Sequence, residues 1–265
     1  MEDVDKQVTL FLMTAQASML NGLIGEADSL LKAVLETLDT HFTQHSRKAT
    51  NLGQKFEKEN TTYMYKIGEL LQSIFGLLVV VPSNPDQNYF QIVDGILNFM
   101  KKEEWGTSAD SYIIQLRVLD SAVRYLASQA QDQLPYNIQN VESNDQIFVG
   151  SDDFQRECSQ LIDYCFDQIL ELIQKLDAVK EQYYTVLFDG CLDAANILIG
   201  TCTLNQKTTG FINKMFKMSD KYLVEHNKVA PVASQLSRVR INSSYEAFRK
   251  KKEQMKQPDK APEPA

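Results

Sequence analysis

The chain of 265 residues contains little proline and glycine. Only 7 Pro and 11 Gly occur, and three of the prolines fall within the last eight positions. Because these two residues most disfavour helix interiors, their scarcity permits long uninterrupted helices. Long hydrophobic runs are also missing. The strongest, Leu70 to Val81, is shorter than the ~20 residues that span a bilayer. It contains Gln72 and Ser73, so it predicts a buried helix end rather than a membrane span.

Positive charge and paired cysteines are scarce as well. The 27 Lys and Arg are outnumbered by 35 Asp and Glu, which gives a formal net charge of −8. We therefore expect no nucleic-acid partner, because neutralising phosphates requires a basic face. The four cysteines form no CxxC pair, and Cys158 and Cys165 share one helical face. Burial as small apolar residues in a reducing compartment fits this pattern. The acidic start, with Glu2, Asp3 and Asp5, does not resemble a signal peptide.

No group of residues has the pattern of a catalytic, cofactor or metal site. Gly190, Gly200 and Gly210 stand ten residues apart, unlike a phosphate-binding loop, and no Gly-x-Ser-x-Gly motif occurs. His41 and His45 are one helical turn apart, but no glutamate lies between them and no third ligand is evident. We interpret them as part of a solvated helix end. The sequence therefore predicts neither an enzyme nor a cofactor.

Apolar residues recur every three or four positions along most of the chain, which is the period of an amphipathic helix. This period predicts helices over residues 3–21, 24–45, 61–81, 87–102, 107–126, 151–176, 178–199, 203–226 and 231–252. Gly22 is placed to end the first helix, and Ser151 to cap the sixth. We interpret the polar stretch from Ser46 to Asn60 as a surface loop or a frayed helix extension. The clearest buried face is formed by Phe154, Cys158, Leu161, Ile162, Cys165, Ile169, Leu172, Ile173 and Leu176.

Nine such helices, at roughly 40 to 50 residues per antiparallel pair, match the repeat length of HEAT- or armadillo-like units. Stacked pairs form a solenoid, which leaves a curved surface for a partner. We therefore predict an all-α fold, an antiparallel helix-pair α-solenoid over residues 1–256, and a disordered proline-rich tail over residues 257–265. If Val4, Leu10 and Phe11 are not all covered by the second helix, the N-terminal face is exposed. That face then either belongs to a longer solenoid or is covered by another protein.

The loop from Tyr136 to Gly150 is long for a compact helical protein. Turn-favouring residues dominate it, yet it also contains apolar side chains that a solvated loop would not need. These side chains either dock on the solenoid or contact a partner. The candidate partner-binding residues in the loop are Tyr136, Asn140, Ser143, Asn144, Asp145 and Phe148. The basic run from Arg249 to Lys252 is interpreted as a charged last helical turn, with weak attraction to anionic lipid as the alternative.

The same loop carries a family resemblance. Residues 136–154 contain a Val-Glu-Ser-Asn-Asp core followed by the helix entry Gly-Ser-Asp-Asp-Phe. Two earlier segments, Val8–Gln16 and Val79–Pro85, precede these residues in the chain. In this order the three segments resemble the C-terminal part of the large scaffold subunits of Retriever, which are similar to the retromer large subunit. The resemblance extends to about Asn227 and includes no catalytic signature. The N-terminal motif for the arrestin-like subunit is absent, and the basic segment after Tyr245 has no match in the family.

The resemblance implies a non-enzymatic scaffold of an endosomal cargo-recycling complex, located in the cytoplasm and peripheral on endosomes. In that family the C-terminal solenoid binds a small subunit with a metallophosphoesterase fold, and the assembly works with the COMMD-containing coiled-coil complex. Membrane contact is then only indirect, through the complex. The residues alone leave a second function open, a generic helical-repeat adaptor that binds short peptides and is unrelated to endosomes.

Overall fold

A computed structural model of the chain describes residues 2–49, 55–79, 88–102, 105, 108–130, 152–178, 184–201, 204–229 and 231–256. These residues form nine helices and no strand, which confirms the predicted all-α class. The helices are α1 (Glu2–Leu20), α2 (Ile24–Ala49), α3 (Lys55–Leu78), α4 (Gln91–Lys102), α5 (Ala109–Gln129), α7 (Asp152–Asp177), α8 (Tyr184–Thr201), α9 (Gln206–Val229) and α10 (Pro231–Lys256).

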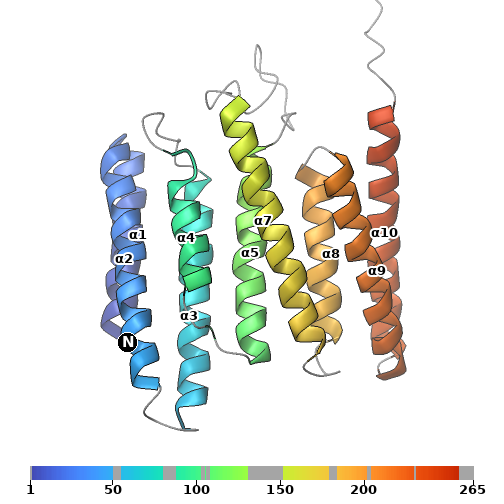
Figure 1. The fold of residues 1–265 in the computed structure, drawn as a ribbon, viewed down its shortest axis with the longest axis horizontal. Helices are drawn as coiled ribbons and strands as arrows, with labels where there is room; N and C mark the ends of the chain where they lie inside the picture. The colour runs from blue at the N-terminus through green and yellow to red at the C-terminus, as the bar shows by residue number, and fades with distance from the viewer. Residues whose placement is uncertain are drawn as a thin grey trace, which may run out of the picture.

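The helices form two layers, in which consecutive helices alternate and reverse direction (Figure 1). The front layer contains α2, α4, α7 and α9, and the back layer contains α1, α3, α5, α8 and α10. Ion pairs join neighbours within a layer. Asp39 of α2 pairs with Lys102 of α4 at 2.8 Å, and Asp177 of α7 pairs with Lys221 of α9 at 2.6 Å. The pairs α1/α2, α3/α4, α5/α7 and α8/α9 thus stack side by side, as predicted for a helix-pair solenoid.

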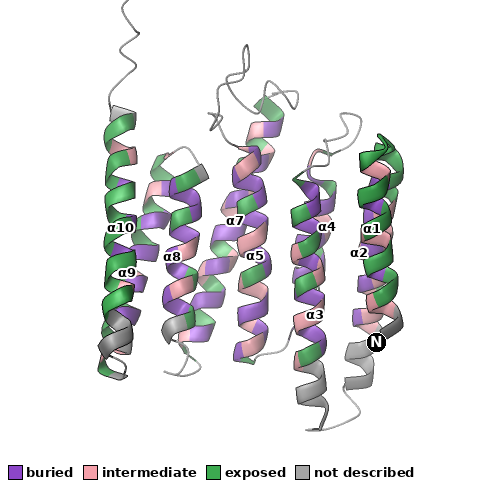
Figure 2. Ribbon diagram, turned by 180° about the vertical axis from the view of Figure 1, so that it is seen from behind, coloured by how far each residue is buried: buried purple, intermediate pink, exposed green. Residues whose placement is uncertain are grey.

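The apolar sides of the two layers meet in one continuous core. Figure 2 shows buried residues mainly on the central helices, whereas α1 and α10 at the two ends are mostly exposed. Phe42 of α2 packs against Phe99 and Trp105, with ring centroids 5.4 and 5.2 Å apart. Farther along, Phe166 of α7 stacks on Phe211 of α9 at 4.1 Å. Such aromatic contacts contribute roughly 0.5–1.5 kcal/mol each beyond the area they bury, so they help to fix neighbouring units against one another.

Local signals account for several helix ends. After α1, the N–H of Gly22 donates to Met19 O and the N–H of Leu23 donates to Ser18 O, the two hydrogen bonds of a Schellman motif. Gly22 has a φ of +75°, a conformation that costs glycine least, so its predicted role is confirmed. Ser108 caps α5 by accepting a hydrogen bond from the N–H of Ser111 at 3.2 Å. These ends set the short connections that hold successive helices antiparallel.

Some predicted boundaries are wrong. The stretch from Ser46 to Asn60 was predicted as a surface loop or a frayed helix extension, and the structure favours helix extension, because α2 continues to Ala49 and α3 begins at Lys55. Its Arg, Lys, Gln and Glu are good helix formers, and polarity alone does not end a helix. The helix predicted from Ala178 begins at Tyr184. The run from Leu70 is also not fully buried, since Val79 is 50% exposed.

The predicted buried face of α7 is confirmed at eight of its nine positions. Leu161 is the exception, because it is only half-buried and lines a surface groove. Phe166 was not among the predicted residues, although it is buried against α9. The buried thiols of Cys158, Cys165 and Cys191 confirm the packing role predicted for these cysteines, whereas Cys202 lies outside the described residues. The proline-rich tail, residues 257–265, lies outside the described residues.

Candidate partner-binding surface

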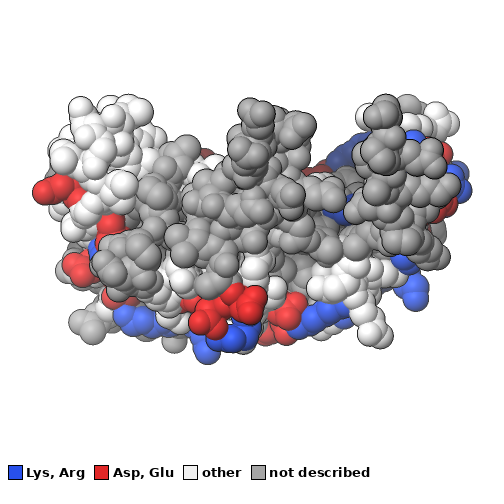
Figure 3. Space-filling view, turned by 90° about the horizontal axis from the view of Figure 1, so that it is seen from above, with Lys and Arg blue, Asp and Glu red and all other residues white. Residues whose placement is uncertain are grey.

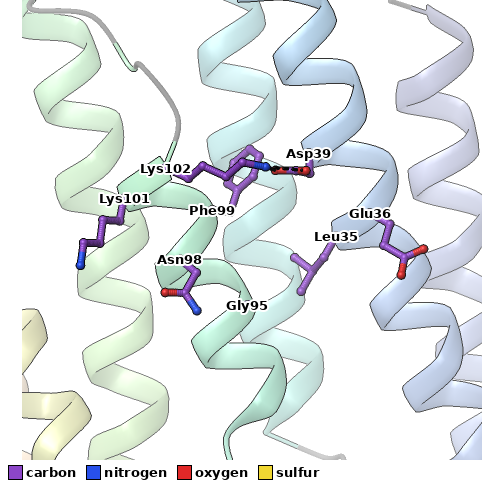
Figure 4. A pocket seen from close by; sticks show the side chains of 8 residues that line it. All are labelled: Leu35, Glu36, Asp39, Gly95, Asn98, Phe99, Lys101 and Lys102. Atoms are coloured by element: carbon purple, nitrogen blue, oxygen red, sulfur yellow. Dashed lines mark hydrogen bonds and ion pairs between the residues drawn. The ribbon is translucent and has the colours of Figure 1, made fainter.

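The first of two adjoining grooves on the front layer lies between α2 and α4 (Figure 4). It has a volume of about 580 Å³. Leu35 and Phe99 form its apolar floor, and Gly95 leaves it open on the α4 side. A Cβ at Gly95 would lie 2.8 Å from Leu35 Cδ1, so the absent side chain is what lets the two helices approach. At one end of the groove, Lys102 Nζ lies 2.8 and 2.9 Å from the carboxylate oxygens of Asp39.

The second groove, between α4 and α7, has a volume of about 530 Å³. Its walls come from α4 and from the first four turns of α7, and they include Leu161 and Tyr164. Asn88, just before α4, organises the mouth of the groove: its Nδ2 donates to Asp94 Oδ2 at 3.0 Å while its Oδ1 accepts from the N–H of Phe90. The groove is therefore built from residues whose positions are fixed by hydrogen bonds or by packing.

Asn98 and Lys101 line both grooves and form the ridge between them. We call the combined area the α2–α4–α7 surface. It is lined by Leu35, Glu36, Asp39, Asp94, Gly95, Leu97, Asn98, Phe99, Lys101, Lys102, Asp153, Arg156, Glu157, Gln160, Leu161 and Tyr164. Five of these side chains are acidic and three are basic. Figure 3, viewed from above, shows acidic and basic residues side by side along the edge that α4 and α7 form. An apolar floor with a rim of mixed charge fits a protein partner better than a polyanion.

Two carboxyl groups in the second groove have perturbed acidity. Burial raises the pKa of Asp94, and the hydrogen bond from Asn88 partly opposes this. The pKa of Glu157 is also raised, first by burial and then by the negative charge of Asp94. Burial therefore disfavours the ionised forms of Asp94 and Glu157. A cation or hydrogen-bond donor from a partner would stabilise these ionised forms.

The basic run at the end of α10 is engaged within the protein. Lys251 Nζ donates to the carbonyl of Ile199 at 2.7 Å, Lys252 lies 5.1 Å from the ring centre of Phe248, and Arg249 pairs weakly with Glu253 at 3.9 Å. These contacts favour a structural role within the helix over attraction to lipid. The predicted last turn is wrong, however, because α10 continues to Lys256.

The partner-binding residues predicted in the loop, Tyr136, Asn140, Ser143, Asn144, Asp145 and Phe148, all lie outside the described residues, so they stay a prediction. The segment that contains them joins Ala130, after α5, to Asp152, the first residue of α7. The α2–α4–α7 surface was not predicted from the sequence. Its signal was weak, because most of its residues are polar ones on the outer sides of amphipathic helices, which any exposed helix would carry.

In the part of the chain that the structure describes, three or more His, Cys, Asp and Glu side chains nowhere gather as a metal site would require. Nor does any helix described there combine the length and the apolar character that a membrane crossing needs.

Two layers of antiparallel helix pairs, with grooves between neighbouring helices, define a HEAT-like α-solenoid of the kind that presents a surface to other proteins. The chain belongs to the VPS35L C-terminal domain family, whose model matches residues 1–259. This finding confirms the resemblance drawn from the three sequence segments. It also corrects its extent, because the family match continues past Asn227 and includes the basic segment after Tyr245.

Named relatives agree with this membership. The chain is 28% identical over 229 residues to "VPS35 endosomal protein sorting factor-like" of Dictyostelium discoideum, a match covering 84% of this chain and 21% of that protein. It is 25% identical over 179 residues to "VPS35 endosomal protein-sorting factor-like" of Danio rerio, covering 68% of this chain and 17% of the relative. The human protein of that name matches at 25% identity over 179 residues, with 66% and 17% covered. The chain thus spans about a fifth of the length of these relatives.

Proposed function

We propose that the chain is a non-enzymatic scaffold in a retromer-like complex that recycles cargo from endosomes, acting in the cytoplasm and peripherally on endosomes. The observation that carries this proposal is membership of the VPS35L C-terminal domain family over residues 1–259. Its direct partner is a small subunit with a metallophosphoesterase fold, and the COMMD-containing coiled-coil complex joins the assembly. Both partners follow from the family resemblance to Retriever subunits.

The α2–α4–α7 surface is the proposed contact area for the small subunit. Two adjoining grooves supply apolar floors for side chains of the partner, and the ridge residues Asn98 and Lys101 supply polar contacts. A permanent subunit interface buries on the order of 2,000 Å² or more, so it must extend beyond the grooves themselves. The loop residues Tyr136 and Phe148 are candidates for that extension, because their segment leads into α7, which forms one wall of the second groove.

The test is affinity capture with the tagged, folded chain, first from a cell extract and then with the purified small subunit. We expect stable co-elution of the two proteins. Lys101→Glu on the ridge should weaken the complex at least tenfold, whereas Glu69→Lys, an equally drastic change on the exposed side of α3, should leave it unchanged. A chain that keeps its helical circular dichroism but retains no small subunit would refute the proposal. Capture of short peptides alone, at micromolar affinity, would support a generic adaptor instead.

A further inference from the structure

The second groove, between α4 and α7, is charged at its two ends and apolar between them. The two helices both start at the top of Figure 1 and run in the same direction. Asp94 of α4 and Glu157 of α7 lie at one end of the groove, close enough for the negative charge of Asp94 to raise the pKa of Glu157. Lys101 and Tyr164 are each seven residues farther along these helices and also line the groove. They therefore mark its other end, about 10 Å away.

Apolar side chains line the middle of this groove. They are Leu97 of α4, which is buried, and Leu161 of α7, which is half-buried. Figure 4 shows that the Lys101 side chain points away from Asp39 and Leu35, which belong to the first groove. Its ammonium group is thus available to the second groove, which it also lines. From one end to the other, the second groove presents two carboxylates, an apolar stretch and one ammonium group.

The charges at both ends of the groove lack counter-ions among the described residues. Arg156, the arginine that lines this groove, pairs with Asp153 at 2.6 Å, and its charge acts on Glu157 less strongly than that of Asp94 does. Within the part of the chain that the structure describes, no ion pair includes Asp94, Glu157 or Lys101. Two neighbouring carboxylates without a cation disfavour each other's ionised forms. The groove therefore keeps an unfavourable arrangement that a cation from outside would relieve.

The neighbouring parts of the chain are unsuited to supply this cation. No Lys or Arg occurs from residue 67 to 100 or from residue 125 to 155. The first range includes the segment before α4, and the second includes the segment between α5 and α7. The segment between α5 and α7 also contains Asp132, Glu142 and Asp145, which would add negative charge beside the two carboxylates. Charge therefore favours another protein as the source of the cation.

We propose that the second groove binds a helix of a partner protein that carries an acidic residue, an apolar residue three or four positions later and an arginine seven positions after the acidic one. Such residues share one face of a helix, and seven residues span about 10 Å, the separation of the two ends of the groove. The arginine contacts Asp94 and Glu157 together, since its planar group has five donors. The apolar residue packs on Leu161, and the acidic residue pairs with Lys101. In this order the helix lies antiparallel to α4 and α7, so that opposite ends of the helix dipoles are neighbours.

The first test compares two short peptides, each held helical by a side-chain bridge. One carries glutamate, leucine and arginine in the proposed order, and in the other the arginine is replaced by glutamine. By fluorescence anisotropy we expect the full chain to bind the arginine peptide about tenfold more tightly. Glu157→Gln should reduce this ratio about threefold or more, whereas Glu171→Gln, the same change farther along α7, should preserve it. Equal binding of both peptides, no binding of either, or a ratio that Glu157→Gln leaves unchanged would overturn the proposal.

The second test reads the order of the charges. Exchanging the glutamate and the arginine within the peptide should weaken its binding to the unaltered chain about tenfold. The double variant K101E/E157K should reverse the preference and bind the exchanged peptide more tightly than the original. A preference that this double variant does not reverse would contradict the proposed contacts. Circular dichroism of each variant shows that a loss of binding is not a loss of fold.

Two further outcomes are distinguished by the same materials. A dimer of the chain that Glu157→Gln dissociates, measured by sedimentation velocity, would assign the groove to a second copy and overturn the proposal. The proposal rests on the proposed function for the identity of the protein that carries the helix. Because the peptides are measured without the small subunit, the peptide result and the co-elution of the small subunit can fail separately.

Discussion

Two glycines on α3 illustrate how one residue type is used in opposite ways. A Cβ at Gly68 would lie 2.5 Å from Ile114 Cγ2, so the glycine lets α3 and α5 pack closely. Gly76 is exposed, and no atom lies within 4 Å of the place where its Cβ would stand. Helical periodicity predicts the helix around both glycines but cannot distinguish them, because the neighbour that matters lies 46 residues away in the sequence.

Alanine at these two positions should change stability in opposite directions. Gly76→Ala should stabilise the chain by about 0.5–1 kcal/mol, since glycine costs that much in a helix interior. Gly68→Ala should destabilise it by roughly 1–3 kcal/mol, because the β-branched Ile114 has little rotamer freedom with which to make room. Urea unfolding of both variants measures the difference. A stabilising Gly68→Ala would mean that α3 and α5 are not in close contact.

Ile169 and Leu161 test the boundary between core and groove on α7. Ile169 is 4% exposed, so Ile169→Ala should cost roughly 2–5 kcal/mol through the cavity it leaves. Leu161→Ala should cost only about 1 kcal/mol, because part of that side chain stays in water at the rim of the groove. Thermal and urea unfolding give both values. Equal losses at the two positions would place Leu161 in the core, where the sequence pattern alone assigned it.

At the scale of a single element, α7 contributes both to the core and to the second groove. Its inner side packs on α5, where the Cys158 thiol donates to the carbonyl of Leu126, and its outer side forms one wall of the second groove. Periodicity predicted the inner side almost completely, because burial of apolar side chains imposes the 3.6-residue repeat. It could not predict the outer side, since polar residues that line a groove and polar residues that only meet solvent follow the same pattern.

Helix ends were harder to predict than helix existence. The cap signal at Gly22 was recognised in the sequence and is confirmed, whereas the cap at Ser108 was not predicted. The cap predicted at Ser151 lies outside the described residues. By contrast, the start of α3 at Lys55 falls within a polar segment whose residues tolerate both loop and helix. Tertiary packing rather than local preference decides such boundaries, so a single sequence does not reveal them.

Glu157 gives a prediction for pH. Its pKa is raised by burial and by Asp94, so the folded state disfavours the ionised carboxylate. Stability from this group is therefore fully present below the ordinary glutamate pKa, about 4.3, and falls as the pH rises from there through the raised value. Glu157→Gln should raise the melting temperature at pH 7, and the gain should vanish near pH 4. Glu69→Gln on α3 controls for the loss of a surface charge. An unchanged or lower melting temperature at pH 7 would contradict the raised pKa.

At the scale of the whole molecule, the two layers give the chain two long faces and two unlike ends. The number of helices, their pairing and the solenoid class followed from the sequence, because repeated amphipathic helices have few other ways to bury their apolar sides. The place of the α2–α4–α7 surface did not follow, since it depends on how far apart these three helices stand. The exposure of Leu10 on α1 was foreseen only as an alternative.

Hydrogen exchange of the full chain, with and without the metallophosphoesterase-fold small subunit, tests the central claim most directly. Amides in a contact surface exchange more slowly when the partner covers them. The proposed scaffold role predicts added protection in the peptides of α2, α4 and α7 that contain the groove residues, and little change on the exposed sides of α3 and α5. Identical exchange with and without the small subunit, or protection confined to the back layer, would contradict it.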